Sequence, residues 1–384
     1  MSRGLKKKTG KKRRTLRSGF TTGTAATAAA MAAKELLFTG NCPEMVKVSL
    51  PGKEMLNIPV NSCGLNRSGI TECTVIKDAG DDPDVTHRAV IGSRVSILPE
   101  SEGIVIAAGE GVGRITKPGL ELAPGEPAIN PGPRRMIREN LSPVSDKDHI
   151  GHGLLVEIFV PRGEILARRT LNKRLGILGG ISILGTTGLV KPMSHAAYVA
   201  TIDSSLAVAK ASGSSGVVCT TGRRSERFAQ DLFPELPEEA FVQIGDFFAR
   251  SMQQSVRRSL RWIILVVFFG KALKMAQGAE HTHAAKSTLA LEELSLLTKK
   301  MCKDPDLAFR VSSSNTAREA FFLLQENCPR VFMCVARKMV NQARKFAGSG
   351  AEVRGVILDY EGRVIADTAA ESDNNVINKK TNCS

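Results

Sequence analysis

Hydrophobic and polar residues alternate over short segments through the first half of the chain. MVKVSL and MLNIPV, within residues 45–60, alternate in this way around a Pro-Gly pair, which predicts a β-hairpin. RAVIGSRVSIL, GIVIAA and LLVEIFV continue the strand pattern. One Ala-rich segment, residues 24–38, predicts a helix that ends before Gly40. Residues 17–200 are therefore predicted to form an α+β domain with Gly/Pro-rich loops.

The second half of the chain has a different pattern, in which fully apolar runs precede helical segments. The runs are GVVCTTG (216–222), FVQIGDF (241–247) and WIILVVFF (262–269). Runs that are apolar on both faces and lead into helices are typical of buried parallel strands in an open α/β sheet. We predict a Rossmann-like open α/β domain over residues 201–370, which makes the chain a mixed α/β protein.

The ends of these predicted strands carry small and polar residues. In open α/β sheets ligands bind beyond the carboxyl ends of the strands. The residues expected around one crevice are Gly222, Arg223, Asp246, Gly270 and Lys271. The later segment GAEHTHAAKS adds His281 and His283. Because residues two apart do not share a helix face, we expect a single hydrogen-bonding histidine, His283, and not a metal-binding pair.

Positive charge is concentrated at the start of the chain. The chain has 53 Lys and Arg against 38 Asp and Glu, and nine of the basic residues lie in the first seventeen positions. Residues 1–16 have no apolar periodicity and are predicted to be a disordered basic tail, with a second flexible tail at residues 371–384. An anion- or nucleic-acid-binding module that uses the basic tail is the alternative function. Nucleic acid is the weaker option, because no aromatic or helical reading motif accompanies the tail.

Neither a membrane span nor an export signal is predicted. The longest strongly apolar run, residues 262–269, is far shorter than the roughly 20 residues that a span needs. The Ala run after the basic tail is followed at once by Lys34 and Glu35, unlike a secretory signal. The eight cysteines show no CxxC pair and no Cys/His ligand spacing. They are interpreted as reduced thiols of a cytoplasmic protein, without a disulfide frame or zinc site.

Several glycine-rich segments each allow more than one interpretation. GEGVGR (109–114) follows a strand, as a dinucleotide fingerprint does, but no helix begins there, so a binding loop or plain turn is favoured. SGFTTGTAATAAA (18–30) presents either an anion-binding helix start or an ordinary N-cap. INPGPRRMI and LGILGGISILGTTGLVKPM are long Gly/Pro-rich stretches of a kind that is usually functional. A small-molecule kinase would need a phosphate-cradling loop and metal-binding acids, which we cannot assemble.

The segment KDAGDDPDVTH, residues 77–87, gathers four aspartates and a histidine. A metal site, a catalytic acid/base cluster and a polar loop are all compatible with this composition. Asp81 and Asp82 precede a proline, where carboxylates commonly accept hydrogen bonds from nearby backbone N–H groups. Lys77 and His87 flank the turn and are expected to be available to a ligand.

Six segments in order carry a resemblance to a known family. They are RSGFTTGTAATAAA, VIKDAGDDPDVTH, GEGVGRITKPGL, GEPAINPGPRRMI, TLNKRLGILGGISILGTTGLVKPM and GKALKMAQGAEHTHAAKS. Together they resemble the cobalt-precorrin-5B C1-methyltransferases (CbiD) of the anaerobic cobalamin pathway, over about residues 17–365. The resemblance implies methyl transfer from S-adenosylmethionine to C-1 of a cobalt-containing, polycarboxylated tetrapyrrole, giving cobalt-precorrin-6A. Departures from the family pattern are Ala25 for a frequent Cys, Val267-Phe268 for Gly-His, and Ala284 for Ser.

The resemblance also implies how the residues are used. Residues 17–200 would bind the substrate and residues 201–370 S-adenosylmethionine; cobalt would enter only with the substrate, so no metal site is expected. A polycarboxylated ring favours arginine, lysine and backbone N–H groups. The substrate-binding candidates are Thr21, Thr22, Lys77, Asp78, His87, Arg114, Lys117, Arg134, Arg135, Thr186, Thr187 and Lys191. No catalytic residue is assigned, no membrane partner is expected, and a homo-oligomer stays open.

Overall fold

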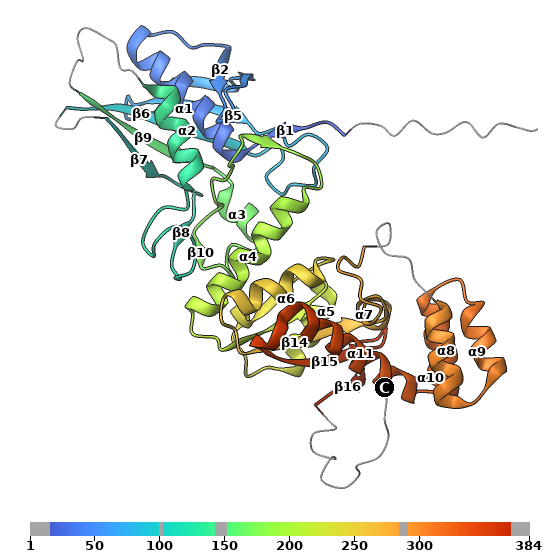
Figure 1. The fold of residues 1–384 in the computed structure, drawn as a ribbon. Helices are drawn as coiled ribbons and strands as arrows, with labels where there is room; N and C mark the ends of the chain where they lie inside the picture. Colours follow the sequence, from blue (N-terminus) through green and yellow to red (C-terminus); the bar gives the residue numbers. More distant parts are fainter. Residues whose placement is uncertain (1–15, 100–102, 143–151, 284–290, 370–384) are drawn as a thin grey trace, which may run out of the picture. The chain divides into compact units, whose positions relative to one another are not determined.

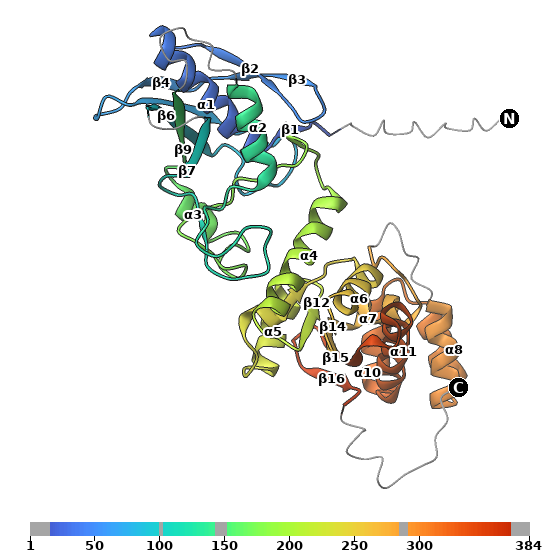
Figure 2. The same ribbon diagram turned by 60° about the vertical axis from the view of Figure 1, so that its left-hand side comes forward.

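The computed structural model describes residues 16–99, 103–142, 152–283 and 291–369. The two predicted tails lie outside these ranges, apart from Leu16. The chain divides into two compact units (Figures 1 and 2). The first unit comprises Met1–Thr116 and Pro124–Ser194, and the second comprises Lys117–Ala123 and His195–Ser384. The loop 117–123, which the sequence analysis assigned to the first domain, thus packs with the second unit.

The first unit is built on a five-stranded sheet. Its strands, in spatial order, are β4 (Ser62–Leu65), β5 (Thr71–Ile76), β6 (Val90–Leu98), β9 (Gly153–Phe159) and β7 (Ile104–Ala108). Neighbouring strands are antiparallel except β9 and β7, which are parallel. This sheet gives the domain one apolar face that must be covered.

Helix α1 (Thr22–Thr39) covers that face. Seven alanines of the helix are fully buried, and small side chains let the helix backbone approach β5 and β6 closely. Gly40 ends the helix with a φ of 72°, a conformation that glycine adopts without steric cost. The predicted helix is therefore confirmed. Helix α2 (Pro131–Leu141) lies beside α1 (Figure 1).

Shorter elements complete the first unit. The predicted hairpin is confirmed, because β2 (Met45–Ser49) pairs antiparallel with β3 (Met55–Pro59). Two small antiparallel pairs lie in the glycine-rich segments, and a short helix follows β9. They are β1 (Gly19–Phe20) with β11 (Leu189–Val190), β8 (Arg114–Ile115) with β10 (Ile177–Leu178), and α3 (Gly163–Ala167).

The second unit contains a sheet with four parallel strands and one antiparallel edge strand. In spatial order the strands are β13 (Phe241–Gln243), β12 (Gly216–Thr220), β14 (Trp262–Phe268), β15 (Glu352–Leu358) and β16 (Val364–Asp367). The first four are parallel and β16 is antiparallel to β15. The three apolar runs are thus parallel strands, as predicted. The strand order reverses between β12 and β14, because the chain runs from β12 outward to β13 and then back to β14.

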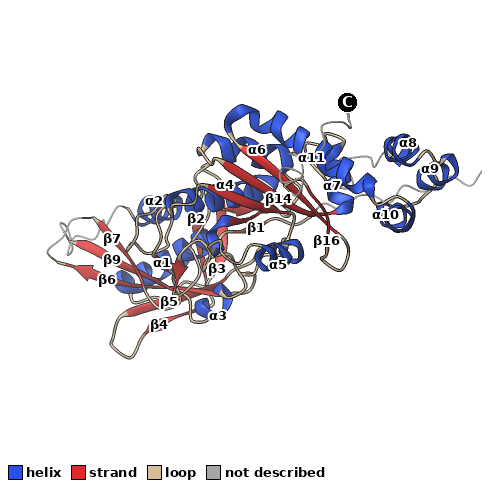
Figure 3. Cartoon of the chain, turned by 90° about the horizontal axis from the view of Figure 1, so that it is seen from below, coloured by secondary structure: helices blue, strands red, loops and turns tan. Residues whose placement is uncertain are grey.

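Helices cover both faces of this sheet. Alternate strand residues such as Val217 and Leu265 face one core, while Val218 and Val266 face the other. Figure 3 shows α6 and α11 on one side of the sheet and α5 on the other. The helices of this unit are α4 (His195–Ala211), α5 (Arg223–Leu232), α6 (Phe248–Arg257), α7 (Phe269–Ala276), α8 (Leu291–Cys302), α9 (Pro305–Ser312), α10 (Ala317–Asn327) and α11 (Arg330–Ala347). Among the described residues, no helix combines the length and apolar character needed to cross a membrane.

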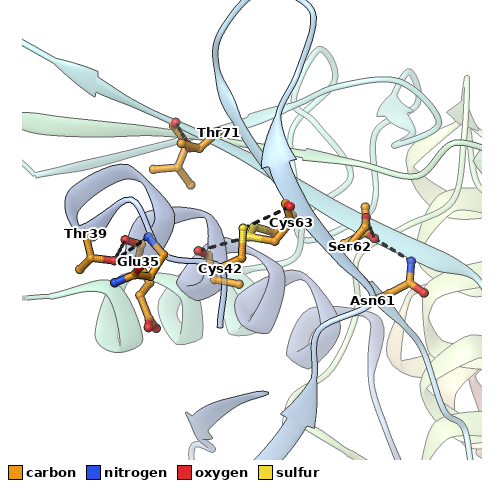
Figure 4. The surroundings of a disulfide bond; sticks show 12 residues. Glu35, Thr39, Cys42, Asn61, Ser62, Cys63 and Thr71 are labelled. Atoms are coloured by element: carbon orange, nitrogen blue, oxygen red, sulfur yellow. Dashed lines mark hydrogen bonds between the residues drawn. A yellow bond between two sulfur atoms is a disulfide. The ribbon is translucent and has the colours of Figure 1, made fainter. Parts of the chain in front are cut away.

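The prediction that all cysteines are reduced thiols is wrong for four of them. Cys63 and Cys73, which face each other across β4 and β5, form a disulfide with a Cα–Cα distance of 4.0 Å (Figure 4). Cys302 and Cys328, at the ends of α8 and α10, form another. Sequence spacing could not reveal these pairs, because strand register and helix packing bring them together. The argument from reduced thiols to a cytoplasmic location therefore loses its basis.

Candidate functional site

The KDAGDDPDVTH segment joins β5 to β6 in the first unit, and its lysine points into the protein. Lys77 is 1% exposed, and its ammonium donates to Asp84 at 2.5 Å. Burial opposes ionisation of Asp84, but the charge and hydrogen bond of Lys77 outweigh it and hold the pKa of Asp84 below its usual range. Lys77 therefore stabilises the loop from inside, and its predicted availability to a ligand does not match its burial.

The aspartates of this segment accept hydrogen bonds from backbone N–H groups. Asp78 and Asp84 make local turns, accepting from the N–H groups of Gly80 and Thr86. Asp81 instead accepts from the N–H of Arg17 at 2.7 Å, and Asp82 from that of Met193 at 2.8 Å. The expected carboxylate bonds are thus present, but those of Asp81 and Asp82 reach distant segments. Through these two bonds the loop connects Arg17 and Met193, which lie near opposite ends of the described part of the first unit, to the sheet.

His87 and Asp78 lie together at the exposed side of this loop. The Nδ1 atom of His87 accepts from the N–H of Ala79 at 3.1 Å, and both side chains are more than a third exposed. The Arg17 guanidinium donates to the Asp78 carboxylate and is the main cause that lowers the pKa of Asp78 to about 2. Among the described residues, no group of three or more His, Cys, Asp or Glu is arranged to hold a metal ion.

The threonines before and within α1 form hydrogen bonds inside the protein. Thr21 is the N-cap and accepts from the N–H of Thr24. Thr22 Oγ1 donates to the carbonyl of Leu184, whose N–H it accepts at 2.8 Å, and Thr24 Oγ1 donates to Gly188 O at 2.7 Å. The start of the helix is therefore tied to the glycine-rich loop 182–188, which supports the N-cap interpretation over the anion site.

The other candidates of the first unit fall into two groups. Arg134 donates to the carbonyls of Ile129 and Pro127 and lies 3.4 Å from Glu126, so it shapes its own loop. The exposed candidates are Arg114, Arg135, Thr186, Thr187 and Lys191. Lys117 belongs to the second unit, where it is ion-paired with Glu239.

In the second unit, the predicted cofactor residues lie at the carboxyl ends of three neighbouring strands. Gly222 follows β12 and is the N-cap of α5, Asp246 follows β13, and Gly270 and Lys271 follow β14. A Cβ on Gly222 would meet nothing within 4 Å, so the backbone there borders open space. Arg223 and His283 are exposed. The structure thus brings the ends of β12, β13 and β14 to one edge.

Asp246 is the centre of a hydrogen-bonded group at this edge. Its Oδ1 accepts from Lys271 and, at 2.9 Å, from the hydroxyl of buried Thr282. Burial opposes its ionisation, but the bonds and charge of Lys271 prevail, so the pKa of Asp246 lies below its usual value. Burial, together with the charge of Lys271, lowers the pKa of Lys274. The edge therefore presents a carboxylate that stays ionised at neutral pH.

Four rings beside Asp246 were not singled out together by the sequence analysis. They belong to His195 and Tyr198 of α4, Phe247 before α6, and His281. His195 and His281 are 86 positions apart in the sequence, so no local pattern could indicate the group. We call these four residues the ring cluster.

A separate cavity of about 560 Å³ lies between α7 and α11. It is lined by Ala276, Lys338, Asn341, Gln342, Arg344 and Lys345. None of the predicted site residues lines this cavity. It is therefore distinct from the strand ends.

Comparison with known proteins assigns the chain to a family. A family model described as CbiD matches residues 9–192, and one described as CbiD, C-terminal domain, matches residues 281–369. A cobalt-precorrin-5B C(1)-methyltransferase of Salinispora arenicola is 43% identical over 358 residues, covering 92% of this chain and 93% of the relative. The chain belongs to the CbiD family. A relative of the same name from Geobacillus kaustophilus is 42% identical, covering 91% of this chain and 94% of the relative.

A solved CbiD structure is also similar. The crystal structure of the cobalamin biosynthesis protein (cbiD) from Archaeoglobus fulgidus is 32% identical, covering 66% of this chain and 78% of that chain, with a TM-score of 0.37. Two of the departures from the CbiD pattern can be placed. Ala25 is fully buried in α1, and Phe268 ends β14 with the Arg224 guanidinium 5.1 Å from its ring centre. Ala284 lies outside the described residues.

Proposed function

We propose that this protein transfers a methyl group from S-adenosylmethionine to C-1 of cobalt-precorrin-5B and so forms cobalt-precorrin-6A. The observation that carries the proposal is the similarity to proteins named cobalt-precorrin-5B C(1)-methyltransferase, at 43% identity over 92% of this chain. A methyltransferase needs a methyl donor, and the sulfonium of S-adenosylmethionine supplies an activated methyl group. The cobalt belongs to the substrate.

We assign the donor to the strand ends of the second unit, which we interpret as Rossmann-like. In such sheets ligands bind where the strand order reverses. Here the reversal lies between β12 and β14, beside Gly222 and Gly270. The open space at Gly222 fits a ligand that approaches the backbone closely, and the ionised Asp246 fits hydroxyl or ammonium donors. Arg223, Lys271 and His283 stay candidates at this edge.

We assign the tetrapyrrole to the first unit. Its exposed cations Arg114, Arg135 and Lys191 suit a ring that bears many carboxylates. Methyl transfer to carbon is an in-line displacement, and alignment of the reacting atoms alone can lower such a barrier by about 7–11 kcal/mol. The main work of this protein would then be to orient two ligands. Half-buried Asp78 and exposed His87, Thr186 and Thr187 stay candidates for contacts to the ring.

The direct test is incubation of the protein with cobalt-precorrin-5B and S-adenosylmethionine that carries a deuterated methyl group. Mass spectrometry should show one labelled methyl group on the tetrapyrrole and an equal amount of S-adenosylhomocysteine. A tetrapyrrole of unchanged mass, with active enzyme from a relative run in parallel, would refute the proposed function.

The position of the donor site is tested by Gly222→Val. A valine there meets no protein atom within 4 Å at its Cβ, so it should fold normally and fill only the space assigned to the donor. Calorimetry should show S-adenosylhomocysteine binding weakened by about tenfold or more, which is about 1.4 kcal/mol. Gly64→Val in β4, also at a position with no atom within 4 Å, is the matched control. Equal affinity in the two variants would move the donor elsewhere.

A further inference from the structure

The ring cluster is formed by residues from three separate segments of the second unit. Phe247 is at its centre, with its ring stacked on Tyr198 at 5.3 Å and edge-on to His281 at 4.7 Å between centroids. His195 stacks on His281 at 5.4 Å and also contacts Phe247 edge-on. These separations and angles are those that aromatic pairs prefer. The cluster is therefore a formed aromatic surface and not a chance meeting of side chains.

This surface is partly open to solvent. Tyr198 is 39% exposed, His195 is exposed, and Phe247 and His281 are half-buried. His195 and Tyr198 are three positions apart on α4 and thus share one face of that helix. Rings that only fixed α4 to the sheet would be expected inside the core, as Phe269, Phe321 and Phe332 are. Exposed rings packed on one another suit a ligand that has a flat face of its own.

The cluster borders the edge where the donor site is proposed. Phe247 directly follows Asp246, and a Cβ on Gly245 would lie 2.7 Å from the Tyr198 hydroxyl. The Tyr198 ring therefore covers the loop that leaves β13. Both the strand end and the aromatic surface belong to the second unit, so one small ligand can touch both.

Nearby groups also bear on which flat ligand fits. Asp246, which directly precedes Phe247, has a carboxylate that is bonded to Lys271 and to the hydroxyl of Thr282. A flat ring attached to a cationic chain suits this edge, because cations are attracted both to a carboxylate and to aromatic faces.

We propose that the ring cluster of His195, Tyr198, Phe247 and His281 is the surface on which the adenine ring of the methyl donor stacks. The inference rests on the proposed function and adds the residues that recognise the nucleoside. Bases stack on aromatic side chains through their π-faces, and such stacking typically contributes enough for the loss of one ring to be measurable. Tyr198 is the principal member because it is 39% exposed, and Phe247, whose ring is stacked on that of Tyr198, supports it.

The test compares Phe247→Leu and Tyr198→Leu with wild type. Leucine keeps much of the apolar volume but removes the π-face. Affinity for S-adenosylhomocysteine and for 5′-methylthioadenosine, which lacks the amino-acid part, should fall by about tenfold for each variant. Phe309→Leu is the matched control, because Phe309 is 71% exposed on α9 and outside the cluster. The KM for cobalt-precorrin-5B should not change.

A second measurement uses the unmodified protein, so it does not depend on how the variants fold. Irradiation with an azido-adenine analogue of S-adenosylmethionine should label peptides that contain Tyr198, Phe247 or His281. Labelling confined to other peptides, or variants that bind both nucleosides as wild type does, would overturn the inference. Variants with unchanged nucleoside affinity but a raised KM for the tetrapyrrole would assign the rings to the other substrate. Wild-type enzyme that binds the nucleosides without methylating cobalt-precorrin-5B would refute the proposed function and leave this inference standing.

Discussion

Lys77 is a buried charged residue that is paired with Asp84. At 1% exposure its ammonium has lost its hydration, and the Asp84 carboxylate replaces it. The composition of the segment indicated carboxylates that accept bonds from backbone N–H groups, but the partners of Asp81 and Asp82 lie far along the chain. The composition could not show that Lys77 points inward, because that depends on how the loop packs on the sheet.

Asp84→Ala is expected to be strongly destabilising. It leaves the Lys77 ammonium buried without its carboxylate, and such changes cost about 3–5 kcal/mol. Asp82→Ala is the control in the same loop. It loses only the bond to the N–H of Met193 and should cost about 1 kcal/mol. Urea unfolding of both variants measures the difference, and equal losses would contradict a structural role for the buried pair.

The lowered pKa of Asp78 predicts how the stability of the protein changes with pH. Its pKa in the folded protein is about 2, below that of a free aspartate, so its contribution to stability is complete above pH of about 4. That contribution should be lost as the pH falls from about 4 to about 2. The Arg17–Asp78 pair is largely exposed, so the effect should be small and should shrink with added salt.

The measurement is the difference in unfolding free energy between wild type and Asp78→Asn across this pH range. Asparagine keeps an oxygen that can accept the N–H of Gly80 but removes the charge. The difference should narrow as the pH falls below 4 and narrow less at high salt. A difference that is constant with pH would show that the charge contributes nothing.

At the scale of elements, the periodicity of apolar residues predicted those helices and strands that local sequence determines. The Ala-rich helix, the hairpin at 45–60 and the parallel strands of the second unit all follow from spacing of apolar residues. Spacing could not predict that loop 117–123 belongs to the second unit. Gly119 of this loop fits against the backbone of Ala207 and Val208, which lie far along the chain. The same limit explains the missed disulfides and the missed ring cluster.

Gly80 shows how one such long-range contact is made. Its φ is 66°, and a Cβ there would lie 2.1 Å from the carbonyl oxygen of Arg17. The segment before α1 therefore passes directly over the turn, and the N–H of Asp81 donates to the same carbonyl at 2.9 Å. Only glycine permits this approach.

Gly80→Ala should therefore cost more than a backbone effect alone. Gly69→Ala is the matched control, because Gly69 has a φ of 74° but no atom within 4 Å of its Cβ. Both variants carry the left-handed penalty of about 1–2 kcal/mol, and Gly80→Ala should lose about 1–3 kcal/mol more by overpacking. Thermal unfolding of the two proteins checks this, and equal melting temperatures would argue against the close approach.

At the scale of the whole molecule, the basic start of the chain separates two hypotheses. Nine of the 53 Lys and Arg lie in the first seventeen residues, and an anion- or nucleic-acid-binding module would use them. The last of the nine, Arg17, is already part of the fold, since its guanidinium pairs with Asp78 and its backbone is bonded to Asp81 on both sides. The match to the CbiD family model begins at residue 9 and therefore covers only part of this basic segment.

Two deletions that differ by three residues separate these roles. Removal of residues 1–15 should leave the melting temperature and the rate of methyl transfer unchanged, because Arg17 and its contacts to Asp78 and Asp81 are retained. Removal of residues 1–18 takes away those contacts and should lower the melting temperature of the protein, because the hydrogen bonds to Asp78 and Asp81 are lost. Nucleic acid should bind wild type weakly, with a salt dependence that disappears in the shorter deletion. If that deletion abolished methyl transfer at moderate salt, the tail would belong to the catalytic protein and not to a dispensable extension.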